Sequence, residues 1–257
     1  MDDSLLYDTD IASNFASTCA FLERCSLGGI IFNPKKFTFA EEEVDYLGFR
    51  LTKEGIKPTT DFLNNIRSFP SSTSITDVRS FYGAVNQISY TFASSPALLP
   101  FRQLLRPQVP FYWSDELEAL FVECKEEIIR QYEKGVRLYD MSLPTALASD
   151  WSKTCMGFWL VQKHCQCPGT PTLGCCKTGW QTVYCGSKFN SGAVSRYHPI
   201  EGEAAAAVHA LDKTSMFTLG HPNLLLAIDH KPLLKIFGNA SMESITNPRL
   251  FNLKQKL

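Results

Sequence analysis

Three carboxylates stand at positions where an α/β fold could bring them together. Asp150 closes a short apolar run that follows Pro144, and Asp229 closes the apolar run LLLAID. Glu203 opens the alanine-rich segment EAAAAVHAL, whose apolar spacing predicts a helix. Carboxylate oxygens presented by a strand, a helix and a second strand are suitable ligands for a divalent metal ion. We therefore expect Asp150, Glu203 and Asp229 to form a metal site.

The predicted helix should bury one of its two glutamates. Its apolar face comprises Ile200, Ala204, Ala207, Val208 and Leu211. Glu203 falls within this face, whereas Glu201 lies off it and is expected in solvent. Because alanines allow the helix to approach the sheet closely, Glu203 should be half-buried, and an unpaired carboxylate there costs several kcal/mol. Either a metal ion or a buried Lys or Arg partner would compensate that cost, and the residues alone leave both open.

The elements around these carboxylates predict an α/β domain. Two apolar runs separated by a polar turn within Pro144–Lys163 predict a β-hairpin, and apolar residues on both of its faces predict a sheet covered on both sides. The expected strands lie near 146–149, 155–162, 182–187 and 224–228, and the expected helices lie at 200–217, near 232–237 and from 248 onward.

Composition sets broad limits on the 257-residue chain. A net charge of −1 and a hydrophobic fraction of 44% are ordinary for a globular protein, and they give no overall basic signature of nucleic-acid binding. No apolar run reaches the length of a membrane span, and the N-terminus lacks the basic region of a signal peptide. We therefore expect a non-secreted protein of the cytoplasm or nucleus, without a membrane partner. Its nine cysteines should be mostly thiols.

The N-terminal segment combines two adjacent acids with a short series of elements. Taken alone, Asp2 and Asp3 would be a solvated acidic terminus. A helix is expected over 11–25, followed by a strand-like segment at 30–32 and a turn at 33–36. The run from 44 to 51 ends at a turn near Gly55.

The next segment predicts a small helical unit. Ser74 and Asp77 have the spacing of a capping box, and a helix with an apolar face of Val78, Phe81, Val85 and Ile88 should follow. Other helices are expected at 61–68, from 95 and over 115–133. Four arginines of this segment are candidates either for phosphate contacts or for a solvated helix face: Arg67, Arg79, Arg102 and Arg106.

The order of these motifs resembles the reverse transcriptase of gypsy-type LTR retrotransposons. The resemblance rests on MDD at 1–3, NPKKFTF at 33–39 and EEEVDYLGFRLTKEGIKP at 41–58, then on VRSFYGAVNQISYTF, an F-x-W helix, AS-D-WS and AI-D-HK. It implies an α/β fold class in the broad sense: an α+β palm remnant at 1–58, a thumb-like helical unit at 59–110 and an RNase H-like α/β domain with a mixed sheet at 111–257.

The resemblance also implies an activity and its residues. The family combines an RNA-directed DNA polymerase with a metal-dependent ribonuclease that cleaves RNA in RNA–DNA hybrids, and Mg²⁺ or Mn²⁺ is the implied cofactor. Asp150, Glu203 and Asp229 match the metal-binding residues of the ribonuclease, and Asp2 and Asp3 match polymerase aspartates, Asp2 as a metal ligand. The implied nucleic-acid contacts, to a hybrid or a primer–template, are Leu47, Gly48 and Phe49 of the primer grip, with Lys36 and Arg79.

The sequence departs from the family pattern at several positions. Met1 stands at the variable position of the polymerase motif, so the aromatic residue, the fingers and the first palm aspartate would lie upstream. The fourth ribonuclease carboxylate would lie downstream. We therefore expect the polymerase to be incomplete and RNA cleavage by this chain to be slow or absent. The alternative is a non-enzymatic nucleic-acid-binding or interaction fragment of a decayed retroelement.

A cysteine-rich loop interrupts the predicted hairpin that follows residue 155. Cys165 and Cys167 precede a segment rich in Pro, Gly and Thr, and Cys175 and Cys176 follow it. Cys-x-Cys and Cys-Cys differ from the paired Cys-x₂-Cys spacing typical of zinc sites. A zinc site is therefore one interpretation, and a reduced, exposed loop is the one that the spacing favours.

Overall fold

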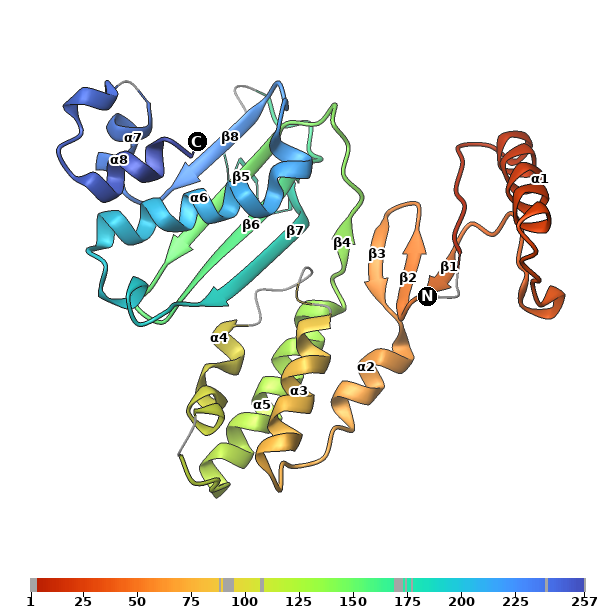
Figure 1. Ribbon diagram of the computed structural model, residues 1–257, viewed down its shortest axis with the longest axis horizontal. Coiled ribbons are helices and arrows are strands. Elements are labelled where there is room, and N and C mark those ends of the chain that lie inside the picture. The colour runs from red at the N-terminus through yellow and green to blue at the C-terminus, as the bar shows by residue number, and fades with distance from the viewer. Residues whose placement is uncertain are drawn as a thin grey trace.

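The computed structural model describes residues 4–87, 89, 95–106, 109–168, 173, 175–176, 178–238 and 240–256. A peripheral helix, a helical unit with a small sheet, and a larger sheet domain follow one another along the chain (Figure 1). No helix within these described residues is long and apolar enough to cross a membrane.

The N-terminal helix α1 (Ile11–Leu27) lies at one end of the molecule, apart from the other helices (Figure 1). Asp10 caps it by accepting a hydrogen bond from the Ser13 backbone N–H. The strand predicted at 30–32 is wrong: in the described chain this segment has no strand partner, and Ile31 is 94% exposed. An apolar run forms a strand only where another strand pairs with it. The turn predicted at 33–36 is confirmed as the short 3₁₀ helix η1 (Pro34–Lys36).

The run from 44 to 58 forms a meander of short antiparallel strands. These are β1 (Val44–Tyr46), β2 (Phe49–Thr52) and β3 (Gly55–Pro58), and β4 (Val136–Arg137) joins their edge much later in the chain. Leu47 and Gly48 connect β1 to β2 with φ angles of 51° and 85°. Positive φ at both central residues matches the twist of a tight hairpin.

The helical unit encloses an aromatic core. Its elements are α2 (Thr60–Arg67), α3 (Ile75–Gln87), α4 (Ser95–Leu98), the 3₁₀ helix η2 (Leu99–Leu105) and α5 (Asp115–Tyr132). The capping box at α3 is confirmed, because Ser74 and Asp77 each accept the other's backbone N–H. Phe81, Phe101 and Phe121 are each 1% exposed. The Phe121 ring packs edge to face against the rings of Phe81 and Phe101. Helix α5 therefore shares its core with the preceding helices.

The sheet domain contains the predicted mixed sheet. Its strands are β5 (Thr145–Trp151), β6 (Cys155–Lys163), β7 (Trp180–Phe189) and β8 (Leu224–Ile228). They lie in the order β7-β6-β5-β8, with β5 and β8 parallel and the other pairs antiparallel. Parallel neighbours need a crossover connection, and helix α6 (Pro199–Thr218) lies in the connection between β7 and β8.

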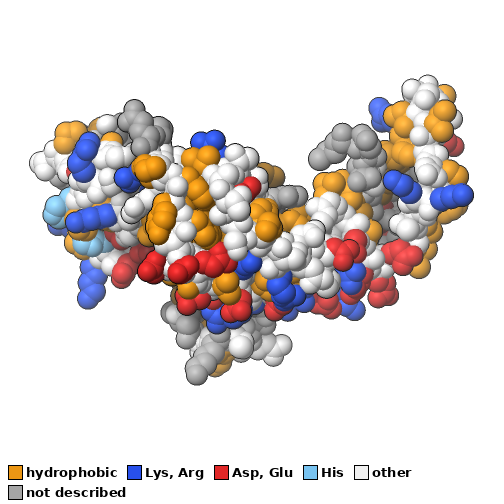
Figure 2. All heavy atoms as spheres, turned by 90° about the horizontal axis from the view of Figure 1, so that it is seen from below, with side chains coloured by type: hydrophobic (Ala, Val, Ile, Leu, Met, Phe, Trp, Pro, Cys, Tyr) orange, Lys and Arg blue, Asp and Glu red, His pale blue; other side chains and the backbone are white. Residues whose placement is uncertain are grey.

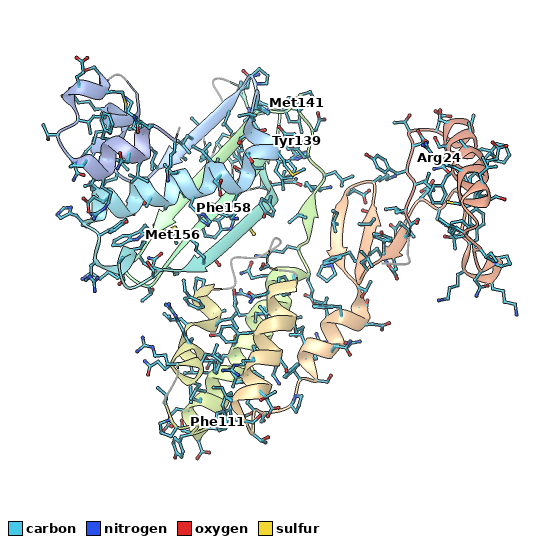
Figure 3. The ribbon with its side chains drawn as sticks, in the orientation of Figure 1. Arg24, Phe111, Tyr139, Met141, Met156 and Phe158 are labelled. Atoms are coloured by element: carbon cyan, nitrogen blue, oxygen red, sulfur yellow. The ribbon has the colours of Figure 1, made fainter. Side chains whose placement is uncertain are left out.

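Helix α6 packs across one face of this sheet. Its Ala207 and Ala210 are 0% exposed, and Leu147, Phe158 and Leu160 of the sheet face it (Figure 3). The prediction of a sheet covered on both faces is wrong for the described chain, because Trp159 and Leu225 on the opposite face are 41% and 39% exposed. Helices α7 (Lys231–Phe237) and α8 (Pro248–Lys254) pack instead against the start of α6. The 3₁₀ helices η3 (Val194–Arg196) and η4 (Met242–Ser244) complete the domain.

Candidate metal centre

Two of the predicted carboxylates follow the same end of neighbouring strands. In the parallel pair of β5 and β8, Ser149 lies opposite Ile228 at the end of the register. Asp150 and Asp229 are the next residues on each strand, and both are exposed. Neighbouring strands lie about 4.8 Å apart, so the backbone alone brings the two aspartates to one edge of the sheet.

The third carboxylate, Glu203, comes from the beginning of α6 and is buried, with 9% of the residue exposed. The preceding Gly202 makes this close approach possible, because a Cβ atom there would lie well under 3 Å from the Trp151 ring. The Trp151 backbone N–H donates to the Glu203 carboxylate. The other oxygen, Oε2, has no hydrogen-bond partner among the described residues. The predicted burial of Glu203 is therefore confirmed.

The electrostatics of Glu203 show that the three carboxylates act on one another. Burial is the largest cause that raises the pKa of Glu203, and the charge of Asp150 and then that of Asp229 raise it further. The Trp151 N–H opposes these effects, and the resulting pKa is about 7. No Lys or Arg forms an ion pair with Glu203 in the described chain. A buried, unpartnered oxygen beside two further acids is a donor set that fits a hard divalent cation.

The oxygen atoms of Asp150, Glu203 and Asp229 do not all lie within 4.8 Å of one another. Among the residues that the structure describes, only four cysteines of the β6–β7 loop form a group whose ligand atoms all lie within 4.8 Å of one another.

Glu201 contradicts the sequence-based expectation that it lies in solvent. It is 8% exposed, and it accepts hydrogen bonds from Asn247 and from Arg249 Nη1 at 2.6 Å. The Asn247 bond is the largest cause that lowers the pKa of Glu201. Helix α8 folds back onto the start of α6, and helical periodicity alone carries no information about such a partner. Glu201 thereby holds α8 beside the element that carries Glu203.

Sequence reasoning missed a groove at the start of α6. It is an open depression of about 670 Å³ lined by Lys153, Ser195, Arg196, Tyr197, His198, Pro199 and Glu201. Arg249 adds a further cation, since its guanidinium lies 4.1 Å from the Tyr197 ring centre. Figure 2 shows Lys, Arg and His side chains gathered at the left end of the molecule, which belongs to the sheet domain. The run Arg-Tyr-His-Pro directly before a helix was the available signal.

The predicted polymerase residues lie elsewhere. Asp2 and Asp3 fall outside the described residues. Leu47 and Gly48 form the β1–β2 turn, and Phe49 packs against the core of the helical unit. Lys36 in η1 and Arg79 on α3 are exposed. The structure does not bring these residues to the carboxylates of the sheet domain (Figure 1).

Arg102 joins the helical unit to the sheet domain. Its guanidinium donates to the Asn190 carbonyl at 3.1 Å and lies 4.3 Å from the Phe189 ring centre. These contacts make Arg102 part of an interface within the chain, an interpretation that the sequence did not suggest. Arg67 donates to the side chain of Asn64 on its own helix.

Comparison with known proteins identifies the class of the sheet domain. Residues 140–257 match the family described as the RNase H-like domain found in reverse transcriptase. The chain is 25% identical over 256 residues to the retrovirus-related Pol polyprotein from transposon 412 of Drosophila melanogaster, covering 97% of the chain and 19% of that protein. It is 22% identical over 165 residues to the transposon Tf2-3 polyprotein of Schizosaccharomyces pombe, covering 64% of the chain and 12% of that protein.

Solved structures agree with this assignment at the level of the fold. The foamy viral protease-reverse transcriptase in complex with RNA/DNA hybrid superposes with a TM-score of 0.72 and 16% identity, over 97% of this chain and 32% of that one. Residues 140–257 are thus an RNase H-like domain of the reverse-transcriptase type. The resemblance to a retrotransposon reverse transcriptase with its RNase H-like domain is confirmed, as is the α/β fold class. The chain spans a fifth or less of these two transposon polyproteins.

Proposed function

We propose that the RNase H-like domain cleaves the RNA strand of RNA–DNA hybrids with Mg²⁺ or Mn²⁺ held by Asp150, Glu203 and Asp229. The observation that carries this proposal is the buried Glu203 carboxylate, which has an unpartnered oxygen and a pKa raised by burial, Asp150 and Asp229. An arrangement of three acids without a cation is electrostatically unfavourable, and a bound divalent cation would remove that cost.

The residues of this chain have distinct parts in the proposed reaction. Bound divalent cations supply activation of water and stabilisation of the departing 3′ oxygen. Glu203 must lose its proton to serve as a ligand, and the Trp151 N–H holds its carboxylate in place. Asp150 and Asp229 are exposed at the sheet edge, where a phosphate could approach.

The groove at the start of α6 is the proposed contact surface for the hybrid. Lys153 and Arg196 would contact phosphates of the backbone, and such contacts weaken as salt concentration rises. A hybrid approaches A-form geometry, and proteins distinguish it by shape and by the 2′-hydroxyls of the RNA strand. The foamy viral structure of the same fold holds an RNA/DNA hybrid, which supports this choice of partner.

For the N-terminal part, we propose a role in holding a primer–template within a longer polyprotein. Leu47 and Gly48 form the turn of the hairpin that the family resemblance assigns to the primer grip, and Phe49 begins its second strand. Lys36 and Arg79 are exposed cations that could contact phosphates. Asp2 and Asp3 would be the polymerase acids of this part, and DNA synthesis would require the remaining polymerase segments of a longer protein.

The decisive experiment measures cleavage of a labelled RNA–DNA hybrid in Mn²⁺ and in Mg²⁺. This chain should cleave the RNA strand slowly or not at all, whereas a version extended through the natural downstream sequence should cleave only the RNA strand. Asp150→Asn in the extended version should abolish cleavage while hybrid binding persists. Glu123→Gln, an exposed acid on α5, is the matched control and should leave cleavage unchanged. If the extended version also binds hybrid without cleaving it in either metal, a non-enzymatic nucleic-acid-binding function replaces this proposal.

A further inference from the structure

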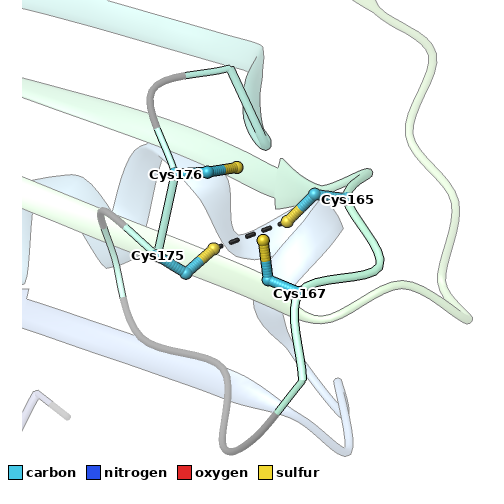
Figure 4. A group of neighbouring side chains, drawn as sticks. All are labelled: Cys165, Cys167, Cys175 and Cys176. Atoms are coloured by element: carbon cyan, nitrogen blue, oxygen red, sulfur yellow. Dashed lines mark hydrogen bonds between the residues drawn. The ribbon is translucent and has the colours of Figure 1, made fainter.

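We propose that Cys165, Cys167, Cys175 and Cys176 form a tetrathiolate Zn²⁺ site that closes the loop between β6 and β7 (Figure 4). This site is separate from the carboxylates and does not depend on the proposed ribonuclease activity. It differs from the reduced, exposed loop that the spacing favours, because all four side chains are partly buried and their sulfur atoms converge.

The sulfur positions match a metal site better than a pair of disulfides. All four sulfur atoms lie within 4.8 Å of one another, and Cys165 Sγ lies 3.4 Å from Cys175 Sγ. A tetrahedral zinc ion with Zn–S bonds of ~2.3 Å holds its four sulfur atoms ~3.8 Å from one another. Disulfide sulfur atoms are only ~2.05 Å apart. The observed spread therefore requires small adjustments to bind zinc and a larger rearrangement to form disulfides.

The two arms of the loop are built to bring the sulfur atoms together. The His164 N–H donates to the Gly179 carbonyl at 2.7 Å, which closes the base of the loop directly after β6. A Cβ atom at Gly179 would lie well under 3 Å from the sulfur atoms of Cys165 and Cys176. The absence of a side chain at this position is thus what allows the two arms to approach. The spacing of the cysteines in the sequence does not reveal this group. Cys-x-Cys and Cys-Cys supply two sulfur atoms each, and the four meet only when the two arms of the loop fold together.

The surroundings of the cluster favour thiolates bound to a cation. The Cys167 backbone N–H donates to Cys165 Sγ, and such a bond favours a thiolate at this position. Thiolates gathered within 4.8 Å of one another would repel each other. A divalent cation removes this repulsion, and each thiol that binds it releases its proton.

The ligand chemistry also selects the metal. Thiolates are soft ligands that bind Zn²⁺, whereas Mg²⁺ and Mn²⁺ prefer carboxylate oxygens. The two candidate sites of this domain should therefore hold different ions at the same time. A closed set of four protein ligands is typical of structural zinc sites, so we assign no reaction to this one.

The test uses the whole chain, purified with a phosphine reductant and without chelator. We expect one zinc ion per chain by mass spectrometry of the metals, retained in excess Mg²⁺. Replacement by Co²⁺ should give the visible absorption bands and sulfur charge-transfer band of a tetrahedral thiolate site. Cys165→Ser and Cys175→Ser should each lose these bands, whereas Cys19→Ser, a cysteine exposed on α1, should keep them.

A second pair of variants tests the packing argument without changing a ligand. Gly179→Ala should lower the affinity for Co²⁺ by roughly 10-fold or more, as changes beside metal ligands commonly do. Gly192→Ala is the matched control, since a Cβ there has no neighbour within 4 Å. Absence of the cobalt bands from the reduced chain would overturn the proposal. So would equal binding by Cys165→Ser, or disulfides among these four cysteines that form while zinc is present.

Discussion

The two candidate metal sites lie at opposite ends of β6 and draw their residues from the chain in different ways. At one end, Gly157 pairs with Asp150, whose partners Glu203 and Asp229 come from a helix and a strand far along the chain. At the other end, Lys163 pairs with Trp180 where the strand ends, and all four cysteines lie between residues 165 and 176. Six residues of extended strand separate the ends by about 20 Å.

The difference lies in what holds each set of ligands. The carboxylates depend on strand register and on the packing of α6, so they come together only when the whole domain folds. The cysteines depend on one loop and on the contact around Gly179. Substitutions in the residues that support the carboxylates should therefore affect both the stability of the domain and its cleavage of hybrid. Substitutions among the cysteines should have local effects.

The largest expected effect comes from Glu203→Gln. The amide keeps the size of the side chain but removes the negative charge. Hybrid cleavage should therefore fall by at least ~10²-fold, which is the loss of rate that a ~1 Å displacement of a reacting group commonly causes. Single-turnover cleavage in saturating Mn²⁺ measures this loss, with Glu123→Gln as control. Cleavage within twofold of the unaltered chain would show that the carboxylates are not the reaction centre.

The next effect compares two glycines that both lie inside helices. Gly202→Ala should destabilise the domain by about 1–3 kcal/mol, because the new methyl group overlaps the Trp151 ring and displaces α6. Gly83→Ala in α3 meets nothing within 4 Å and should instead stabilise by about 0.5–1 kcal/mol. Urea unfolding of both variants measures the contrast. Equal effects would mean that α6 does not depend on close contact with the sheet.

The pH dependence of stability gives a third effect, of at most about 3 kcal/mol for the pKa shift of Glu203. The pKa of Glu203 rises from an ordinary 4.5 to about 7 on folding, mainly because of burial. The folded chain then binds more protons than the unfolded chain between these values, so stability without metal should fall as pH rises through this window. Glu203→Gln should remove this component. Thermal unfolding in chelator from pH 4 to 8 compares the two, and parallel curves would contradict the assignment.

The sequence predicted the burial of Glu203 and the positions of Asp150 and Asp229 at the strand ends, because regular periodicity determines them. A strand-end aspartate stays at the sheet edge whatever the exact strand limits, and the alanine face of α6 fixes the side on which Glu203 lies. The sequence failed where a distant element decides the outcome. Glu201 is buried by Arg249 and Asn247 of a later segment, and the apolar run at 30–32 has no strand partner in the described chain.

The convergence of the four cysteines in the β6–β7 loop was hard to predict for a different reason. Ligand spacing describes known zinc motifs, but sulfur convergence here depends on a glycine on the opposite arm. Gly179 carries no chemical signal of its own in the sequence. The close approach of the two arms at Gly179 depends on the absence of a side chain there, so only the folded structure of the loop reveals it.

The smallest expected effect comes from the four cysteines of the β6–β7 loop together. Replacing all four cysteines by serine should leave the thermal unfolding temperature and hybrid cleavage nearly unchanged, because the backbone bonds of β6 and β7 and the carboxylate end remain intact. Resistance to proteases between residues 163 and 180 should nevertheless fall, since zinc no longer joins the two arms of the loop. Limited proteolysis followed by mass spectrometry locates the cuts, and the unaltered chain with zinc removed by chelator should give the same pattern. Loss of hybrid cleavage in the fourfold variant would instead couple the two ends of β6 and refute the independence argued from their separation.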